Sequence, residues 1–325
     1  MKPLLVVLTP VRNEAWILPA FLKATSLWAD HIIIADQMST DGSRDIYPHY
    51  EKVTVIDNPR AEMHQARTRQ LLFDAAKRIE GNKILLALDA DEFLSGDFIH
   101  SQGWQTILNS EPGDVFWFRW MFLKSDVTKY TLTVPLYWAA HMNDEVMNGI
   151  FPDSQIHEWR LPWPRHVNHK YIIEDISFIH FARVNVNRYM NKSRFYQVST
   201  AFHAEKYSGV SLYRLYHTIS KDIIYDVPND AYDYYLRNGL DIHSFINLND
   251  GGQHYVDNTL SNLQTKGLKH FKKLNIWDKQ FCDMYGIEDP CNWFDKVMMF
   301  YLRLTNKYSK NILIRAIDKI LKIIY

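Results

Sequence analysis

The sequence predicts an α/β fold in which a mostly parallel sheet is followed by a helical C-terminal region. Four short apolar runs in the first 90 residues are continuous rather than alternating, which is typical of parallel strands covered on both faces. Helical segments separate these runs, so strand and helix alternate as in a right-handed parallel layer. The expected strands are residues 4–8, 32–35, 53–56 and 84–88, and the expected helices are residues 14–27 and 62–79.

The second expected helix has one apolar face, with the spacing i, i+3, i+4 and i+7. That face is formed by Leu72, Ala75, Ala76 and Ile79. After residue 95 the pattern changes, and prolines mark a loop-rich middle segment. Bulky apolar runs predict further strands at residues 114–123, 130–140 and 172–182, and the chain is mostly helical from about Arg188 onward.

Composition excludes several classes of protein. The 325 residues are 47% apolar and 23% charged, as in an ordinary globular protein. The 37 basic and 37 acidic side chains cancel, so no nucleic-acid partner is expected. Two cysteines, Cys282 and Cys291, are too few for a disulfide framework or a zinc module and favour a reducing compartment. Because no run approaches a signal-peptide core or the ~20 apolar residues of a membrane span, we expect a cytoplasmic protein.

Polar clusters follow three of the expected strands, where ligands bind in an open α/β sheet. They are residues 9–14, residues 36–43 and Asp89-Ala90-Asp91-Glu92. Because parallel strands end at one edge of the sheet, these clusters should converge. Neither a glycine-rich dinucleotide motif nor a P-loop motif is present in the sequence.

Asp89 and Asp91 are the strongest candidates for ion binding. In an extended segment, residues i and i+2 point the same way, so both carboxylates should face one spot. Such a pair is costly without a cation, and hard oxygen ligands suit Mg²⁺ or Mn²⁺, which would hold a diphosphate. The alternative is that the two carboxylates cap the next helix or pair with an arginine.

These elements, in this order and spacing, resemble a family 2 glycosyltransferase with the GT-A fold. The resemblance covers roughly residues 4–200. It rests on Pro10-Val11-Arg12-Asn13-Glu14, Asp36 with Ser39-Thr40-Asp41-Gly42-Ser43, Arg67, and Asp89-Ala90-Asp91-Glu92-Phe93-Leu94.

The resemblance implies an inverting, metal-dependent enzyme that moves a sugar from a UDP- or GDP-sugar. The acceptor would be a hydroxyl of a glycan or a lipid-linked molecule, as in polysaccharide or lipopolysaccharide biosynthesis. The GT-A domain would span residues 1–205, with a nucleotide-binding half at 1–95 and an acceptor half at 96–205. Residues 206–325 would form the helical region.

The resemblance also assigns individual residues. The nucleotide-sugar contacts would be Pro10, Arg12, Asn13, Glu14, Asp36, Asp41, Arg67, Asp89 and Ala90. Arg69 replaces Arg67 if the register slips by two, and an Asx turn before Gly42 explains Asp41 about as well. Asp91 would ligate Mn²⁺ or Mg²⁺, and His180 would be a further ligand, unless His180 is a satisfied core histidine. A basic–aromatic stretch of Tyr189, Lys192, Arg194 and Tyr196 would steady the diphosphate, although a solvated helix face is slightly favoured.

An inverting transfer also needs a carboxylate that takes the proton of the acceptor hydroxyl. The candidates are Asp144, Glu145, Asp153 and Glu158, of which Asp153 is the first choice and Glu158 the second. The Glu-Asp or Asp-Asp signature that is usual in the family is not obvious at this place.

Residues 309–325 predict an amphipathic helix with lysines beside its apolar face. Such a helix could lie on an anionic bilayer, which would suit a peripheral enzyme with a lipid-linked acceptor at the cytoplasmic membrane face. The favoured alternative is that the apolar face docks on the protein and the lysines remain in water.

Two other functions remain open. A sugar-phosphate nucleotidyltransferase would resemble enzymes with a glycine-rich loop and a downstream lysine after the first strand, and residues 10–14 have neither. A catalytically silent sugar-nucleotide or glycan-binding module would not need the Asp89/Asp91 pair.

Overall fold

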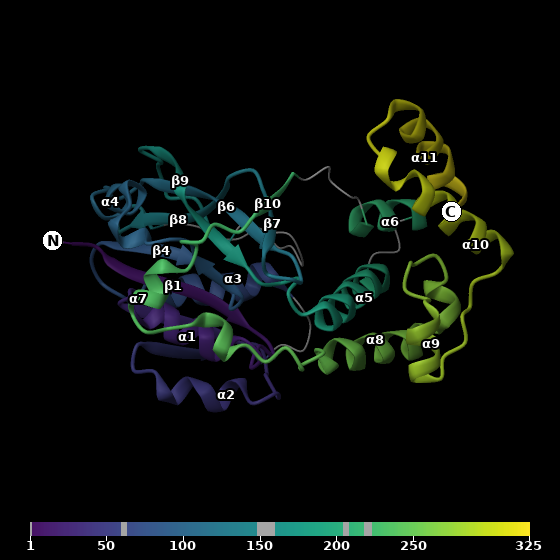
Figure 1. Ribbon diagram of the computed structural model, residues 1–325, viewed down its shortest axis with the longest axis horizontal. Helices are drawn as coiled ribbons and strands as arrows, with labels where there is room; N and C mark the ends of the chain where they lie inside the picture. The colour runs from purple at the N-terminus through teal and green to yellow at the C-terminus, as the bar shows by residue number, and fades with distance from the viewer. Residues whose placement is uncertain (1, 60–63, 148–159, 204–207, 218–222) are drawn as a thin grey trace. The chain divides into compact units, whose positions relative to one another are not determined.

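The computed structural model describes residues 2–59, 64–147, 160–203, 208–217 and 223–325. The chain forms two compact units (Figure 1). The first contains residues up to 184 and residues 224–249, and the second contains residues 185–223 and 250–325.

The first unit is built on a sheet of ten strands among the described residues, with the order β10-β7-β6-β8-β4-β1-β2-β3. The strands are β1 (Leu4–Val11), β2 (His31–Asp36), β3 (Val53–Asp57), β4 (Lys83–Ala87), β5 (Glu92–Leu94), β6 (Val115–Leu123), β7 (Lys129–Leu132), β8 (Leu136–Met142), β9 (Lys170–His180) and β10 (Ile224–Asp226). Strands β1 to β4 pair in parallel, and β4 pairs with β8 in the antiparallel sense. Off this path, β9 pairs with β5 and β6.

The predicted α/β class and the four parallel strands are confirmed. The single strand expected at residues 130–140 is wrong, because the structure has two strands there, β7 and β8. Pro135 lies between them, and a proline has no N–H to donate to a sheet.

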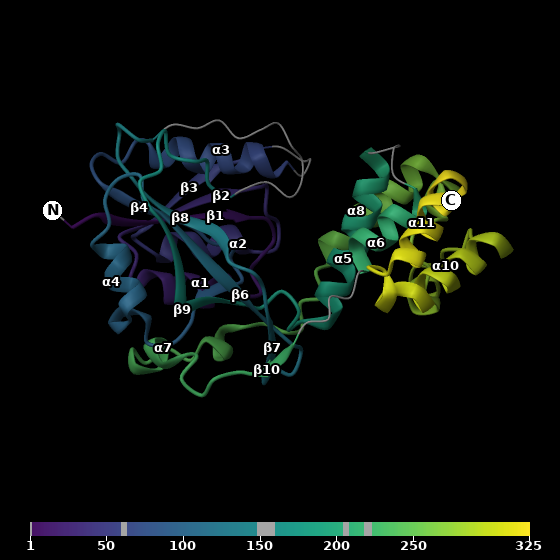
Figure 2. The ribbon, with the colours of Figure 1, turned by 90° about the horizontal axis from the view of Figure 1, so that it is seen from above.

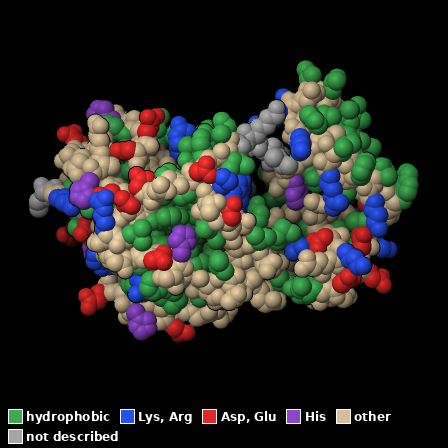
Figure 3. All heavy atoms as spheres, in the orientation of Figure 1, with side chains coloured by type: hydrophobic (Ala, Val, Ile, Leu, Met, Phe, Trp, Pro, Cys, Tyr) green, Lys and Arg blue, Asp and Glu red, His purple; other side chains and the backbone are tan. Residues whose placement is uncertain are grey.

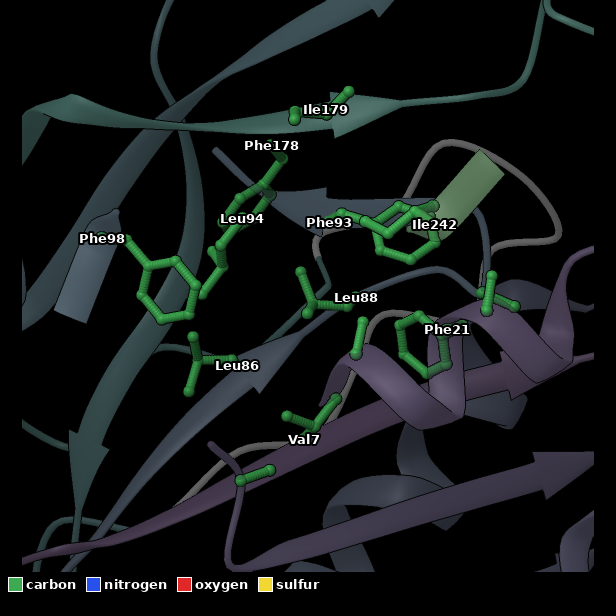
Figure 4. Close-up of a cluster of buried hydrophobic side chains, with 14 of the residues drawn as sticks. Val7, Phe21, Leu86, Leu88, Phe93, Leu94, Phe98, Phe178, Ile179 and Ile242 are labelled. Carbon is green, nitrogen blue, oxygen red and sulfur yellow. The ribbon is translucent and has the colours of Figure 1, made fainter. Parts of the chain in front are cut away.

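Apolar cores lie on both faces of the sheet, as the continuous apolar strands require. Side chains alternate along β1, so that Val7 packs with α1 (Leu18–Ser26) on one face and Val6 packs with α3 (Gln65–Ala76) on the other. Figure 2 shows these two helices on opposite sides of the strands. On the α1 side, Phe93 of β5 packs against Phe21 of α1, and Phe178 of β9 belongs to the same buried cluster beside Leu94 (Figure 4).

The remaining helices of the first unit are short, and the regular elements described in the second unit are all helices. In the first unit they are α2 (Ser43–Ile46), α4 (Gln102–Leu108) and α7 (Asp233–Arg237), with 3-10 helices η1 (Tyr47–His49), η2 (Phe98–His100) and η3 (Ile242–Phe245). The second unit contains α5 (Val186–His203), α6 (Gly209–His217), α8 (Gln253–Lys266), α9 (Lys279–Tyr285), α10 (Trp293–Thr305), α11 (Ile312–Ile324), η4 (Leu268–Phe271) and η5 (Asn306–Tyr308).

The boundary between the two compact units lies between residues 184 and 185, before α5. Helix α5 packs along α8, and the rings of Phe195 and Tyr255 lie 5.7 Å apart. The chain then returns to the first unit, where β10 pairs with β7. The sequence shows no change in apolar composition at residue 184 that would mark this boundary.

The expectation that the apolar face of the C-terminal helix docks on the protein is wrong. Ile320 is 65% exposed and Ile323 is 83% exposed, whereas Asp318 on another face of α11 is buried. A polar contact decides which face of α11 packs on the protein, since Asp318 accepts hydrogen bonds from Arg214 and from the Tyr301 hydroxyl. No described helix is long and apolar enough to cross a membrane.

The free energy of unfolding should depend on pH because of the buried His217. Burial, aided by the positive charge of Arg303, lowers the pKa of His217 to about 4 from an ordinary 6.5. Between these values the unfolded chain binds a proton that the folded chain does not, so the free energy of unfolding should fall as pH decreases from 6.5 to 4. Urea unfolding across this range should show a weaker pH dependence in His217→Asn. An identical dependence in the variant and the wild type would rule out His217 as the titrating group.

Candidate functional site

The loops after β1 and β2 are held together by hydrogen bonds. The Asn13 N–H donates to Ser39 Oγ (2.9 Å), and the Thr40 N–H donates to Asn13 Oδ1 (2.7 Å). The Glu14 N–H donates to Ser43 Oγ (3.0 Å). Asn13 has a φ of 57°, in the left-handed region that asparagine tolerates better than most residues. The two loops therefore form one ordered structure at the carboxyl edge of the sheet.

Asp36 is fully buried beneath these loops. Its carboxylate accepts hydrogen bonds from the Ser39 N–H (3.0 Å), Arg44 Nη1 (2.8 Å) and the Tyr47 hydroxyl (2.6 Å). Burial and the neighbouring Asp36 raise the pKa of Tyr47, which keeps that hydroxyl a donor. In this structure Asp36 orders the loop, and its direct contact with a nucleotide stays a prediction.

Asp41 has a similar local role. Its Oδ1 accepts from the N–H and the hydroxyl of Ser43, and its Oδ2 accepts from the Ala15 N–H (2.9 Å). The bond to the Ser43 N–H is the Asx turn that the sequence offered as the alternative. The Asp41 carboxylate thus links both loops.

The other predicted donor-binding residues lie around the same edge. Pro10 pairs with Ala35 across β1 and β2, and Glu14 Oε2 accepts from Trp16 Nε1 (2.6 Å). Arg12 is half-buried, and Ala90 is buried in the core on the α1 side, so that the Ala90 methyl group points away from solvent. Arg67 is exposed in the first turn of α3, whereas Arg69, the alternative, is buried.

A buried cation that the sequence did not predict, Arg160, lies beside the carboxyl end of β4. Arg160 forms a two-bond fork with Glu92, with Nη1 2.6 Å from Oε2 and Nη2 2.8 Å from Oε1. Its Nη2 also lies 2.6 Å from Asp89 Oδ2. The guanidinium lies 3.9 Å from the ring centre of Trp138. Charge-assisted bidentate bonds of this kind fix position as well as charge.

Glu92 is therefore held from several sides. Besides Arg160, it accepts a hydrogen bond from Trp120 Nε1 (2.7 Å) and one from the Asp89 N–H (2.9 Å). Burial raises the pKa of Glu92, and the positive charge of Arg160 opposes that rise. The alternative offered for the carboxylate pair, that it pairs with an arginine, thus describes Asp89 in this structure.

Asp91 is placed differently. Strand β5 pairs with β9 so that Glu92 lies opposite His180, and this register brings His180 Nε2 to 3.4 Å from Asp91 Oδ1. The His180 ring lies against Trp120, and its buried Nδ1 makes no hydrogen bond to the described residues. The structure thus brings together the two side chains predicted as metal ligands.

These residues fit a divalent cation. Ligand atoms of Asp91, Glu92 and His180 lie within 4.8 Å of one another. Carboxylate oxygen with imidazole nitrogen is a donor set that Mn²⁺ accepts. The 3.4 Å separation of His180 Nε2 and Asp91 Oδ1 is longer than a good hydrogen bond. Glu92 is bound by Arg160 and Trp120, and Asp91 and His180 are the two members of this group that the sequence predicted as metal ligands.

The structure describes two of the four candidates for the catalytic base. Asp153 and Glu158 lie outside the described residues. Asp144 is 70% exposed and lies 3.6 Å from the buried Lys83 Nζ, and Glu145 is also exposed. In the basic–aromatic stretch of α5, Arg194 pairs with Asp278 (2.6 Å) within the second unit.

Comparison with known proteins gives a match to one family model and matches to solved structures, among them the following two. Residues 6–151 match the model of glycosyl transferase family 2. The mannose-1-phosphate geranyltransferase from Thermus thermophilus has a TM-score of 0.28 at 14% identity, covering 42% of this chain and 50% of that chain. HddC from Yersinia pseudotuberculosis has a TM-score of 0.30 at 10% identity, covering 56% of this chain and 94% of that chain. This chain therefore spans half the length of the first structure, and no curated protein matches its sequence.

Removing Arg160 should destabilise the first unit. Arg160→Met leaves the buried Glu92 without its counter-charge, and loss of one partner from a buried ion pair costs about 3 kcal/mol. Urea unfolding should therefore show a clearly lower midpoint for this variant. The double variant Arg160→Met/Glu92→Gln should recover part of the loss.

The matched control is Arg165→Met, because Arg165 is exposed five residues further along the chain. It should unfold like the wild type. An Arg160→Met protein as stable as this control would show that Arg160 is not needed to neutralise the carboxylates.

Proposed function

Since residues 6–151 of the chain match the model of glycosyl transferase family 2, we propose that the protein is an inverting, metal-dependent glycosyltransferase. Its donor would be a UDP- or GDP-sugar, and its acceptor a hydroxyl of a glycan or lipid-linked molecule. The observation that carries this proposal is the meeting of Asp91 and His180 beside Asp89 at the carboxyl edge of β4. The ordered loops after β1 and β2 lie at the same edge of the sheet.

The nucleotide would bind against the loops after β1 and β2. Arg12, Asn13 and Glu14 are the proposed contacts, and Arg67 would approach the diphosphate. Asp36 and Asp41 support this site by holding the loops in one conformation, as their hydrogen bonds indicate. A preformed loop lowers the entropy that binding would otherwise cost.

Arg160 would reduce the negative charge of the site. Three carboxylates within four residues would repel an incoming diphosphate. Arg160 offsets the charges of Asp89 and Glu92, and Asp91 and His180, which lie beside each other, would hold Mn²⁺ or Mg²⁺. When bound, such an ion supplies positive charge that stabilises the departing nucleoside diphosphate.

A carboxylate of the chain would take the proton of the acceptor hydroxyl as the sugar is transferred. Asp153 is the proposed base and Glu158 the second candidate. A lipid-linked acceptor would require the enzyme to work at a membrane surface.

Asp91→Asn should abolish sugar transfer while the fold is retained, because the variant removes a charged ligand of the ion. With a panel of UDP- and GDP-sugars and Mn²⁺, the wild type should release UDP or GDP, and the variant should do so at least about 100-fold more slowly. Calorimetric titration with Mn²⁺ should show weaker binding to the variant. Asp74→Asn, an exposed carboxylate on α3, is the matched control and should behave like the wild type.

The products distinguish the proposal from its alternatives. Release of pyrophosphate would indicate a nucleotidyltransferase, and donor binding without turnover would indicate a binding module. Full transfer activity in Asp91→Asn would overturn the role of Asp91 as a metal ligand.

Asp153→Asn should lower kcat by roughly 10²–10⁴-fold and leave the donor Kd unchanged, because a general base acts only on the acceptor proton. Glu158→Gln, measured in parallel, should have a much smaller effect. Loss of kcat in Glu158→Gln alone would transfer the role to Glu158. Normal turnover in both variants would exclude both residues.

A further inference from the structure

Helix α11 is attached to the second unit by a polar contact and leaves its apolar stripe uncovered. The contacts are made by Asp318, Leu321 and Tyr325, on one face of the helix. Arg214 holds Asp318 with two hydrogen bonds, Nε to Oδ2 (2.8 Å) and Nη2 to Oδ1 (3.2 Å). The exposed apolar stripe on the other face consists of Ile312, Leu313, Ile317, Ile320, Ile323 and Ile324.

Helix α10 exposes a second apolar stripe in the same unit. Its members follow the spacing i, i+4, i+7 and i+11, so they share one face of the helix: Trp293, Val297, Phe300 and Leu304. Trp293 is 76% exposed and Phe300 is 68% exposed. The opposite face of α10 is committed to packing, since Met298 and Leu302 are buried with Tyr213 of α6. The stripe is therefore available to a partner outside the unit.

The charged side chains around the two stripes are mostly basic, and one of them, Lys296, pairs with Asp289 (3.3 Å). Residues 293–325 are all described, and they carry seven basic side chains: Lys296, Arg303, Lys307, Lys310, Arg315, Lys319 and Lys322. The two acidic side chains of this segment, Asp295 and Asp318, are both buried and face Lys272 and Arg214. Figure 3 shows hydrophobic side chains gathered over α11 with Lys and Arg side chains nearby. The exposed surface is thus apolar and cationic in a chain whose net charge is zero.

We propose that α10 and α11 form a surface that binds anionic phospholipid bilayers, with both helices lying in the plane of the interface. Apolar side chains would enter the acyl boundary while lysines remain at the anionic headgroups. Trp293 and Tyr308, which is also exposed, are side chains that favour the headgroup level. Both helices contain 13 residues, fewer than the ~20 of a membrane span, so they would lie on the bilayer.

Charge favours a bilayer over a second copy of the chain. A symmetric dimer through these stripes would place one cationic surface against another, which costs free energy. An anionic bilayer complements both the charge and the apolar stripes. Together with the proposed function, on which this last step rests, the surface would bring the enzyme to a lipid-linked acceptor.

Co-sedimentation of the full chain with vesicles tests the proposal without donor or metal. The protein should bind vesicles of equal parts phosphatidylcholine and phosphatidylglycerol more strongly than vesicles of phosphatidylcholine alone, and salt should weaken the binding. The double variant Phe300→Asp/Ile320→Asp should lower the partition coefficient at least about tenfold, because two apolar anchors become charged. Lys319→Gln and Lys322→Gln should each lower binding to the anionic vesicles about fivefold.

Val134→Asp is the matched control, because Val134 is an exposed apolar side chain of the first unit. It should bind vesicles like the wild type, and circular dichroism should show that all variants remain folded. Absence of binding to anionic vesicles, or equal binding by the double variant, would overturn the proposal. So would a dimer in solution that Phe300→Asp disrupts. Release of UDP or GDP from the donor, measured with a soluble acceptor and without vesicles, reports on the proposed transferase activity separately.

Discussion

The ion pair that Arg160 forms with Glu92 and Asp89 is the interaction on which the candidate site depends. Three carboxylates lie within four residues at the end of β4, and one of them, Glu92, has no exposed side-chain surface. A buried carboxylate is tolerated only when a partner compensates its charge. Arg160 provides that compensation and contacts the rings of Trp120 and Trp138. These contacts engage Asp89 and Glu92, while Asp91 lies beside His180.

The parallel half of the sheet could be predicted because its signal is local. Strands β1 to β4 are continuous apolar runs, and each can be recognised without knowing its neighbours. The antiparallel half was predicted less well, since Pro135 divides one apolar segment into two strands. The amphipathic character of α11 was also visible in its periodicity. Which face of α11 docks was not, because the deciding contact joins Asp318 to Arg214, 104 residues earlier in the chain.

The candidate site, like the fold, could be predicted only in part from the sequence. Asp91 and His180 were paired through a family resemblance, and the register of β5 with β9 is what places them side by side. The roles of Asp36 and Asp41 in ordering the loops depend on partners such as Tyr47 and Ala15, which sequence spacing does not reveal. Arg160 was not identified, because its importance comes from carboxylates 71 and 68 residues away. One local signal was available: three acids at the end of a buried strand require a cation.

The assignment of charges around Arg160 is tested most directly by anomalous diffraction at the manganese absorption edge, on crystals grown with Mn²⁺ and UDP. We expect one manganese peak within bonding distance of Asp91 and His180, with the guanidinium of Arg160 still on Asp89 and Glu92. A peak between Asp89 and Glu92 with Arg160 displaced, or an ordered UDP with no manganese beside Asp91, would contradict it.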